Sequence, residues 1–226
     1  TVLEQLKLLA KDGWGALAYP AAYGGEDNIE SYAAVFEHLL FTDGSLAVKF
    51  GVQFGLFGGS IQNLGTKRHH DHYLKATGAA ELLGCFAMTE TGHGSNVRGI
   101  KTTATYIHQS RSLVLHTPGG NDNKEYIGNA LHATMATVFA QLIVEGKNQG
   151  VHAVLVPLRD EKHQVLPGIT VEDNGYKLGL NGVDNGKIWF DQVQVPVDNL
   201  LDKYGKIETD GTYVSTIKNA NKRLFT

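Results

Sequence analysis

The sequence predicts an α+β protein in which a helical N-terminal segment is followed by an antiparallel β-barrel or β-sandwich domain. Apolar residues recur at helical spacing through the first eighty residues. From Gly84 onward, short apolar runs alternate with period two and are separated by Gly, Asn, Pro and Asp. No helical pattern separates these runs, as parallel βαβ units would require. We therefore expect helices and strands to be segregated along the chain.

Four helices are expected in the N-terminal segment. The first covers residues 2–12, and its apolar stripe consists of Val2, Leu3, Leu6 and Leu9. Asn28 or Asp27 can cap a second helix. Its apolar set includes Ile29, Tyr32, Ala33, Phe36, Leu39 and Leu40. Short links between the helices favour antiparallel packing.

A third helix is expected to begin near Ser45, and Ser60 can cap a fourth. In the fourth helix the inward positions are Ile61, Leu64 and Leu74. The positions expected to face water are Lys67, Arg68, His69 and Asp71.

Seven short β-rich runs follow, and this number and spacing favour a sandwich or barrel. They cover residues 85–88, 103–107, 113–115, 136–144, 151–158, 169–171 and 188–195. After Pro196 the sequence is typical of a loop until about Ser215, where a new segment begins. No cap precedes Val2 and no stop signal follows Leu224, so we interpret the chain as a fragment.

Composition excludes several classes of partner. The chain has 20 Lys and Arg against 23 Asp and Glu and no basic tract, which disfavours nucleic acid and anionic membrane surfaces. No apolar run approaches the roughly 20 residues that span a bilayer, so we expect no membrane insertion. Cys85 is the single cysteine, which excludes an internal disulfide and fits a core position in a reducing compartment.

The most informative stretch is residues 85–99, in which a buried strand runs into a glycine-rich loop. Gly92 and Gly94 lack Cβ atoms, so the backbone can approach a ligand closely. Thr89, Thr91 and Ser95 add hydroxyl groups that donate and accept hydrogen bonds. The loop therefore favours a planar or phosphorylated ligand, although a hairpin with locally satisfied hydroxyls remains the alternative.

The motif Thr-Glu-Thr-Gly-His-Gly-Ser-Asn at 89–96 resembles the signature of the peroxisomal-type acyl-CoA oxidases, within the acyl-CoA dehydrogenase superfamily. Four later segments, at 139–142, 150–160, 179–186 and 190–196, resemble the same family in the same order. Tyr19-Pro20 and the Tyr-Gly-Gly at 23–25 add to the match, which covers about residues 84–201 most fully.

The resemblance implies three parts: a partial N-terminal helical domain at 1–83, a middle β domain with the flavin-binding loop at 84–200, and the start of a truncated C-terminal helical domain at 201–226. It also implies that FAD is the cofactor. Thr89 would bond the flavin ring, Gly128 would lie against its edge and Tyr126 would cover it. The complete expected set is Thr89, Thr91, Gly92, Gly94, Ser95, Tyr126 and Gly128.

The implied reaction is α,β-desaturation of a fatty acyl-CoA thioester. In the family the base is a Glu of the C-terminal domain, and no equivalent precedes Thr226, so we expect no catalytic residue and no turnover in this fragment. Glu90 is interpreted as a structural neighbour of Thr89. Residues 125–129 resemble the dehydrogenase pattern more than the oxidase one, which leaves either oxygen or an electron-transfer flavoprotein as the acceptor. A homodimer or larger homo-oligomer is expected, in the cytoplasm if bacterial, which is preferred, or in the peroxisome if eukaryotic.

Other patterns in the sequence suggest different sites or functions. The cluster at 68–72 contains three histidines and Asp71, but neighbouring helical positions point in different directions, so a solvated face is favoured over a metal site. His93 is interpreted as a turn residue. The spacings for a serine hydrolase and for a dinucleotide fingerprint are absent. A non-catalytic β domain serving assembly is the main alternative function.

Overall fold

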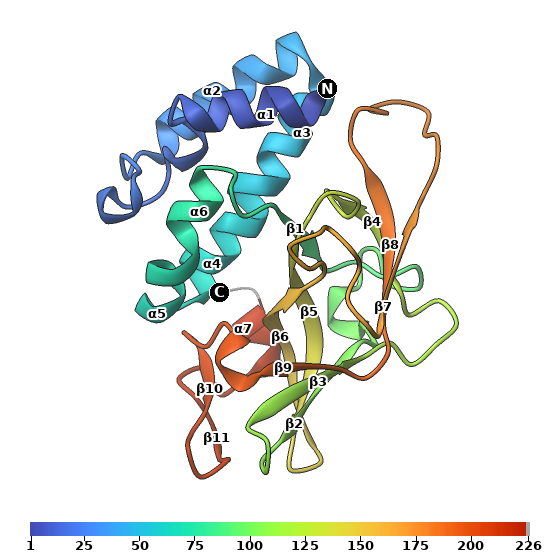
Figure 1. Cartoon of the computed structure of the whole chain (residues 1–226). Coiled ribbons are helices and arrows are strands. Elements are labelled where there is room, and N and C mark those ends of the chain that lie inside the picture. Colours follow the sequence, from blue (N-terminus) through green and yellow to red (C-terminus); the bar gives the residue numbers. More distant parts are fainter. Residues whose placement is uncertain (225–226) are drawn as a thin grey trace.

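The computed structural model describes residues 1–224, and helices cover its first eighty residues. Figure 1 shows the helices of the N-terminal region packed at one end of a curved β structure, whereas the short C-terminal helix lies beside the sheet. The helices are α1 (Val2–Lys11), α2 (Ile29–Thr42), α3 (Gly44–Phe50), α4 (Gly59–Leu64), α5 (Lys67–His69), α6 (Lys75–Gly78) and α7 (Ala220–Leu224). The predicted α+β class is confirmed.

The first two helices each begin after an N-cap residue whose side chain accepts a backbone hydrogen bond. Thr1 caps α1 through a capping box with Glu4, so the expectation that no cap precedes Val2 was wrong. Asn28 caps α2 by accepting a hydrogen bond from Ser31 N at 2.8 Å, as predicted. The predicted apolar set of α2 is only partly buried, because Ile29 and Leu40 are 65% and 50% exposed.

A continuous helix runs from α3 to α4 through a π-helical segment, Gly51–Gly58. Ser60 therefore lies inside a helix, and the prediction that it caps one was wrong; its hydroxyl donates to Phe57 O at 2.7 Å. Gly58 lies within this helix. A Cβ there would lie 1.7 Å from the Tyr19 hydroxyl oxygen, so this glycine permits a close helix contact and does not end the helix.

His69 was predicted to face water but is 2% exposed. Its Nδ1 accepts from Thr66 N at 3.0 Å, and its Nε2 donates to Asp198 O at 3.0 Å. This side chain therefore ties the helical region to residues near the end of the β structure. Ile61 and Leu74 are fully buried, as predicted.

The larger sheet is mixed, and the prediction of a purely antiparallel structure was wrong. Strand β6 (Lys147–Pro157) pairs antiparallel along one edge of β5 (Met135–Val144). The other edge of β5 is shared by β1 (Gly84–Ala87) and β2 (Thr103–Ile107), which both run parallel to it. Alternation of apolar residues reports burial and carries no information about strand direction, so the sequence could not distinguish these cases.

The remaining strands complete this sheet and form two smaller ones. Strands β3 (Ser112–His116) and β9 (Val193–Pro196) extend the large sheet beyond β2. A three-stranded sheet has the order β4-β8-β7, and a two-stranded one pairs β10 with β11. Their bounds are β4 (Lys124–Gly128), β7 (Ile169–Asp173), β8 (Asn185–Phe190), β10 (Gly205–Ile207) and β11 (Tyr213–Ser215). The sequence missed β4, β10 and β11, and the single run predicted at 188–195 is two strands separated at Asp191 and Gln192.

The turn between β5 and β6 is tight. Glu145 and Gly146 both have positive φ, at 50° and 73°, and Val144 pairs directly with Lys147. Two residues in this conformation match the right-handed twist of an antiparallel pair.

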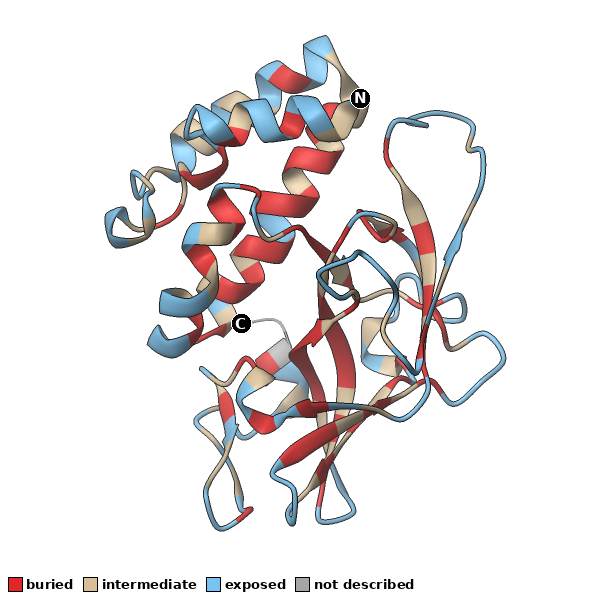
Figure 2. Cartoon of the chain, in the orientation of Figure 1, coloured by how far each residue is buried: buried red, intermediate tan, exposed pale blue. Residues whose placement is uncertain are grey.

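Burial follows the layers (Figure 2). One apolar cluster fills the β region, a second joins α4 to the sheet, and a third joins α1, α2 and α3. Cys85 is fully buried, as predicted. Among residues 1–224, no helix combines the length and the apolar character that a bilayer crossing requires.

The helical region is joined to the first strand by Gln53, which is fully buried. Its amide nitrogen donates to Leu82 O at 2.8 Å, and its amide oxygen accepts from Gly84 N at 2.9 Å. The side chain therefore satisfies backbone groups at the point where β1 begins.

We expect Gln53→Leu to lower the free energy of unfolding by about 3 kcal/mol, because buried backbone groups would lose their partners. Urea unfolding followed by circular dichroism measures this. Gln164→Leu, at an exposed position, is the control and should change stability little. Equal effects of the two substitutions would contradict the role of Gln53.

Candidate functional site

The glycine-rich loop leaves the sheet through a gap in one edge. Pairing of β1 with β5 ends at Ala87 opposite Val138, and pairing of β2 with β5 starts at Thr103 opposite Gln141. Residues 88–102 lie between these strands in sequence and form the excursion that contains the predicted ligand loop. The loop is thus anchored on both sides by strands of the same edge.

A buried ion pair fills this gap. Lys124 Nζ lies 3.0 Å from Glu90 Oε1, and neither side chain is exposed. The same ammonium donates to Met88 O at 2.9 Å and to Phe139 O at 2.7 Å. The Glu90 carboxylate also accepts from the amides of Lys101 and Thr102. These contacts favour a structural role for Glu90.

The environment favours the charged form of Glu90. Burial alone would raise the pKa of this carboxyl, but Lys124 and the hydrogen bonds from Thr102 and Lys101 outweigh burial and lower it. Burial lowers the pKa of Lys124, and Glu90 acts in the opposite direction.

The loop and β4 are joined at Thr89. Its hydroxyl donates to Glu125 O at 2.9 Å, and Glu125 N donates to Thr89 O at 3.1 Å. Two of the predicted segments, 36 positions apart in sequence, therefore lie side by side. Because the hydroxyl proton is used by Glu125, the oxygen lone pairs of Thr89 are available to accept from a ligand.

The next two loop residues also form hydrogen bonds with residues 121–125. Thr91 N donates to Asn123 O, and the Thr91 hydroxyl contacts the Glu125 carboxylate. Gly92 N donates to Asn121 O at 2.8 Å. Gly94 and Ser95 lie farther along the loop and are exposed, and no heavy atom lies within 4 Å of a Cβ built on Gly94.

Strand β4 presents an aromatic ring to the surface. The pairing of β4 with β8 is interrupted between Lys124 and Ile127. Within this bulge Tyr126 has φ of 57° and is 67% exposed. A non-glycine residue in the left-handed region is strained, and such strain is concentrated at functional positions.

Gly128 ends β4 beside the helical region. A Cβ at this position would lie 3.1 Å from Val52 Cγ2. Val52 in turn lines an open groove of about 440 Å³ between α2 and the helix that begins with α3. The groove is almost entirely apolar, and its other lining residues include Tyr32, Phe36, Val48 and Leu56. The end of β4 is therefore next to a surface suited to a hydrocarbon group.

A second buried ion pair joins the two regions behind Gly128. Lys49 of α3 contacts Asp184, and the two side chains are 1% and 7% exposed. Lys49 also donates to Asn129 Oδ1 at 3.0 Å, and Asp184 accepts from Leu131 N at 2.9 Å. Burial alone would raise the pKa of Asp184, but His132 and Lys49 lower it to about 2.

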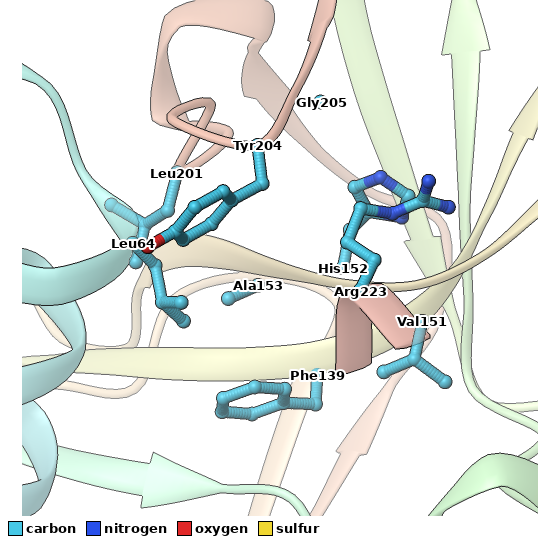
Figure 3. A pocket seen from close by; sticks show the side chains of 9 residues that line it. All are labelled: Leu64, Phe139, Val151, His152, Ala153, Leu201, Tyr204, Gly205 and Arg223. Atoms are coloured by element: carbon cyan, nitrogen blue, oxygen red, sulfur yellow. The ribbon is translucent and has the colours of Figure 1, made fainter. Parts of the chain in front are cut away.

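A pocket of about 60 Å³ lies elsewhere, between α4, β6 and the segment at 201–205 (Figure 3). None of the seven predicted site residues lines it. Its polar lining includes Arg223 and His152. The Nδ1 of His152 donates to Gly150 O, and its Nε2 accepts from the Tyr213 hydroxyl. Burial lowers the pKa of His152 to about 4, so the ring is neutral at pH 7.

The competing sites have structural explanations. Both ring nitrogens of His69 are occupied by Thr66 and Asp198, and residues 1–224 contain no group of three or more potential ligands placed to hold a metal. His93 forms a turn in which its backbone exchanges two hydrogen bonds with Glu90. Lys124 and Lys49 were not identified from the sequence, because their partners are 34 and 135 positions away.

Two family models match most of the chain. The model described as Acyl-CoA dehydrogenase, N-terminal domain, matches residues 2–81, and that described as Acyl-CoA dehydrogenase, middle domain, matches residues 85–193. Acyl-coenzyme A oxidase 2, peroxisomal, from Arabidopsis thaliana is 48% identical over 206 residues, which are 88% of this chain and 30% of that protein. An acyl-coenzyme A oxidase-like protein of Mus musculus is 49% identical over 188 residues, 83% of this chain and 30% of that protein.

Solved structures agree. Acyl-CoA oxidase 3 from Yarrowia lipolytica superposes with a TM-score of 0.79 at 39% identity, covering 94% of this chain and 31% of that one. Acyl-CoA oxidase-1 from Caenorhabditis elegans, complexed with FAD and ATP, superposes with a TM-score of 0.72 at 37% identity, covering 74% of this chain and 26% of that one. The chain thus spans less than a third of the length of these relatives.

The Asp184 contacts generate a pH dependence. Its pKa is lower in the folded chain than the ordinary 3.8, so the stabilisation is present above about pH 4 and is lost as pH falls toward 2. We expect this group to contribute about 2 kcal/mol to the loss of unfolding free energy between pH 5 and pH 2. Urea unfolding measured at several pH values across this range should show a smaller loss of unfolding free energy for Asp184→Asn than for the unmodified chain. Asp12→Asn, at an exposed position, should leave the dependence unchanged, and parallel curves for all three chains would contradict the assignment.

Proposed function

Because the chain belongs to the acyl-CoA dehydrogenase family, we propose that it forms the flavin-binding part of an acyl-CoA oxidase that introduces an α,β double bond into fatty acyl-CoA thioesters. Family models that match residues 2–81 and 85–193 support the proposed division at 1–83 and 84–200. A third domain that starts at 201–226 is part of the same proposal, although residues 225 and 226 lie outside the described residues. The match covers 30% of the length of the Arabidopsis thaliana relative, so the activity of the whole protein enters here as a proposal.

One observation carries the proposal: the paired hydrogen bonds between Thr89 and Glu125. They bring the glycine-rich loop beside the segment that contains Tyr126 and Gly128. The resulting surface offers a hydroxyl oxygen that can accept a hydrogen bond, an exposed ring that can stack, and a glycine edge. A planar heteroaromatic ring with N–H groups fits this set.

The proposed cofactor is FAD, which would accept the hydride from the β-carbon when bound. Thr89 would accept a hydrogen bond from a ring N–H, and the Tyr126 ring would exclude water from one face. Gly92, Gly94 and Gly128 would let the backbone approach without side-chain obstruction, and the Ser95 hydroxyl would donate or accept a hydrogen bond. Thr91, held by Glu125, would keep the loop close to β4.

The apolar groove between α2 and α3 supports an acyl-CoA substrate. The Val52 side chain packs against Gly128 on one side and lines the groove on the other. A hydrocarbon chain in the groove would therefore start next to the proposed flavin position. Burial of its methylene groups would stabilise the complex by about 0.8 kcal/mol for each CH₂.

Oxygen is the proposed electron acceptor in preference to an electron-transfer flavoprotein, because the matched relatives named above are acyl-CoA oxidases. Two Arabidopsis thaliana relatives have "peroxisomal" in their names. No support for the expected cytoplasmic location comes from them, so we propose the peroxisomal alternative. A homodimer or larger homo-oligomer remains part of the proposal.

We expect the chain to bind FAD and Thr89→Val to weaken binding about tenfold, since the hydroxyl's hydrogen bonds to the flavin and to Glu125 O would both be lost. Titration with FAD, followed by the quenching of flavin fluorescence, measures the affinity. Thr170→Val, at an exposed position of β7, should leave it unchanged. A colourless chain without affinity for FAD would instead favour the assembly-module alternative.

We expect the isolated chain to show no acyl-CoA-dependent reduction of bound flavin, because the general base is proposed to lie outside these residues. The measurement is the absorbance of the flavin band after anaerobic addition of acyl-CoA. Bleaching in the isolated chain would contradict the absence of a catalytic base. The longer protein should bleach, and admission of oxygen should restore its flavin band.

A further inference from the structure

We infer that Lys124 is a positioning residue for the proposed flavin site, which holds the Thr89 segment against β4. The inference rests on the proposed function, because it concerns where Thr89 stands relative to a bound flavin. Lys124 does not itself line the surface, since its side chain is fully buried. It would act through the backbone of residues 88–90.

The first support is the complete use of the Lys124 ammonium. An ammonium has three N–H groups, and three acceptors surround it at 2.7 to 3.0 Å. Two of them, Met88 O and Phe139 O, lie one residue beyond the last β1–β5 pair, Ala87 and Val138. Lys124 thus bridges the two strands just where their backbone ladder stops.

The second support is the way that Glu90 closes the other end of the excursion. Its carboxylate accepts from Lys101 N at 2.7 Å and from Thr102 N at 2.9 Å. The Thr102 hydroxyl adds a third bond, at 2.6 Å. Residues 88–90 and 101–102 are therefore held together by one carboxylate, whose charge is balanced by Lys124.

The third support is the position of Lys124 in the chain. It directly precedes Glu125, which exchanges two hydrogen bonds with Thr89. The Lys124 side chain thus holds Met88 and Glu90, and the Glu125 backbone holds Thr89 between them. Loss of the ammonium would leave Glu90 as a buried, uncompensated charge, and the segment could then satisfy that carboxylate only by moving toward water.

The test compares Lys124→Met, which has a similar length and no donors, with a control that removes another buried hydrogen bond. Thr117→Val removes the acceptor of Phe190 N and lies outside the loop. Amide exchange is measured on both chains and on the unmodified chain. In Lys124→Met we expect the protection factors of the Lys101 and Thr102 amides to fall at least tenfold more than those of the β5–β6 amides. In Thr117→Val we expect no such difference.

The flavin arm uses FAD itself as the probe. We expect Lys124→Met to weaken FAD binding at least tenfold and to shift the visible band of any flavin that binds, whereas Thr117→Val should do neither. Glu90→Gln retains an acceptor for Thr102 and should give a smaller loss of affinity than Lys124→Met. Because both Lys124→Met and Thr117→Val lower stability, binding is measured at temperatures equally far below each melting point.

Different results would overturn the positioning role of Lys124 and the proposed flavin site. If the unmodified chain binds FAD and Lys124→Met binds it within twofold with an unshifted band, the positioning role is overturned and the proposed function stands. If the unmodified chain does not bind FAD, the proposed flavin site fails and the positioning role fails with it. Loss of protection spread evenly over loop and β5–β6 amides would also overturn the positioning role, because it would show general destabilisation.

Discussion

The arrangement of the site depends on the ion pair between Glu90 and Lys124. Without it, the gap between β1 and β2 on the edge of β5 would contain carbonyl and amide groups with no partners, in a region closed to water. Such groups are costly to bury, and the two side chains of the pair satisfy four of them and the Thr102 hydroxyl. The chain can therefore leave the edge of β5 after β1, form the loop and return as β2 without leaving these backbone groups unpaired.

The pair between Lys49 and Asp184 has a corresponding role between the helical and β regions. Buried ion pairs contribute little net stability, because desolvation opposes the attraction, yet loss of one partner is costly. Both pairs thus act mainly on specificity of arrangement. One fixes the loop to β4, and the other fixes α3 to the residues that follow Gly128. The two sides of the proposed ligand surface are set by charges rather than by apolar packing alone.

The sequence predicted the features that are local in the chain and missed those that are not. Helix starts at Asn28 and near Ser45, the change of period at Gly84 and the glycine-rich loop all rest on neighbouring residues, and the structure has them. The parallel pairing of β1 and β2 with β5, the continuity of the helix through Ser60 and the burial of His69 depend on distant partners. Strand β4 was missed because Tyr126 interrupts its alternation. The set of ligand residues came from a family resemblance, and the residues that hold them in place carried no sequence signal.

The tight turn at Glu145 and Gly146 has a consequence for the order in which the chain folds. Strands β5 and β6 are joined by two residues, so their pairing closes almost no loop and can form early. By contrast, β1 and β2 precede β5 by some 50 and 40 positions and can join its edge only after β5 has been synthesised. During synthesis on the ribosome, the hairpin would thus act as the template onto which earlier strands dock, while the N-terminal helices, whose contacts are nearer in sequence, assemble without waiting for it.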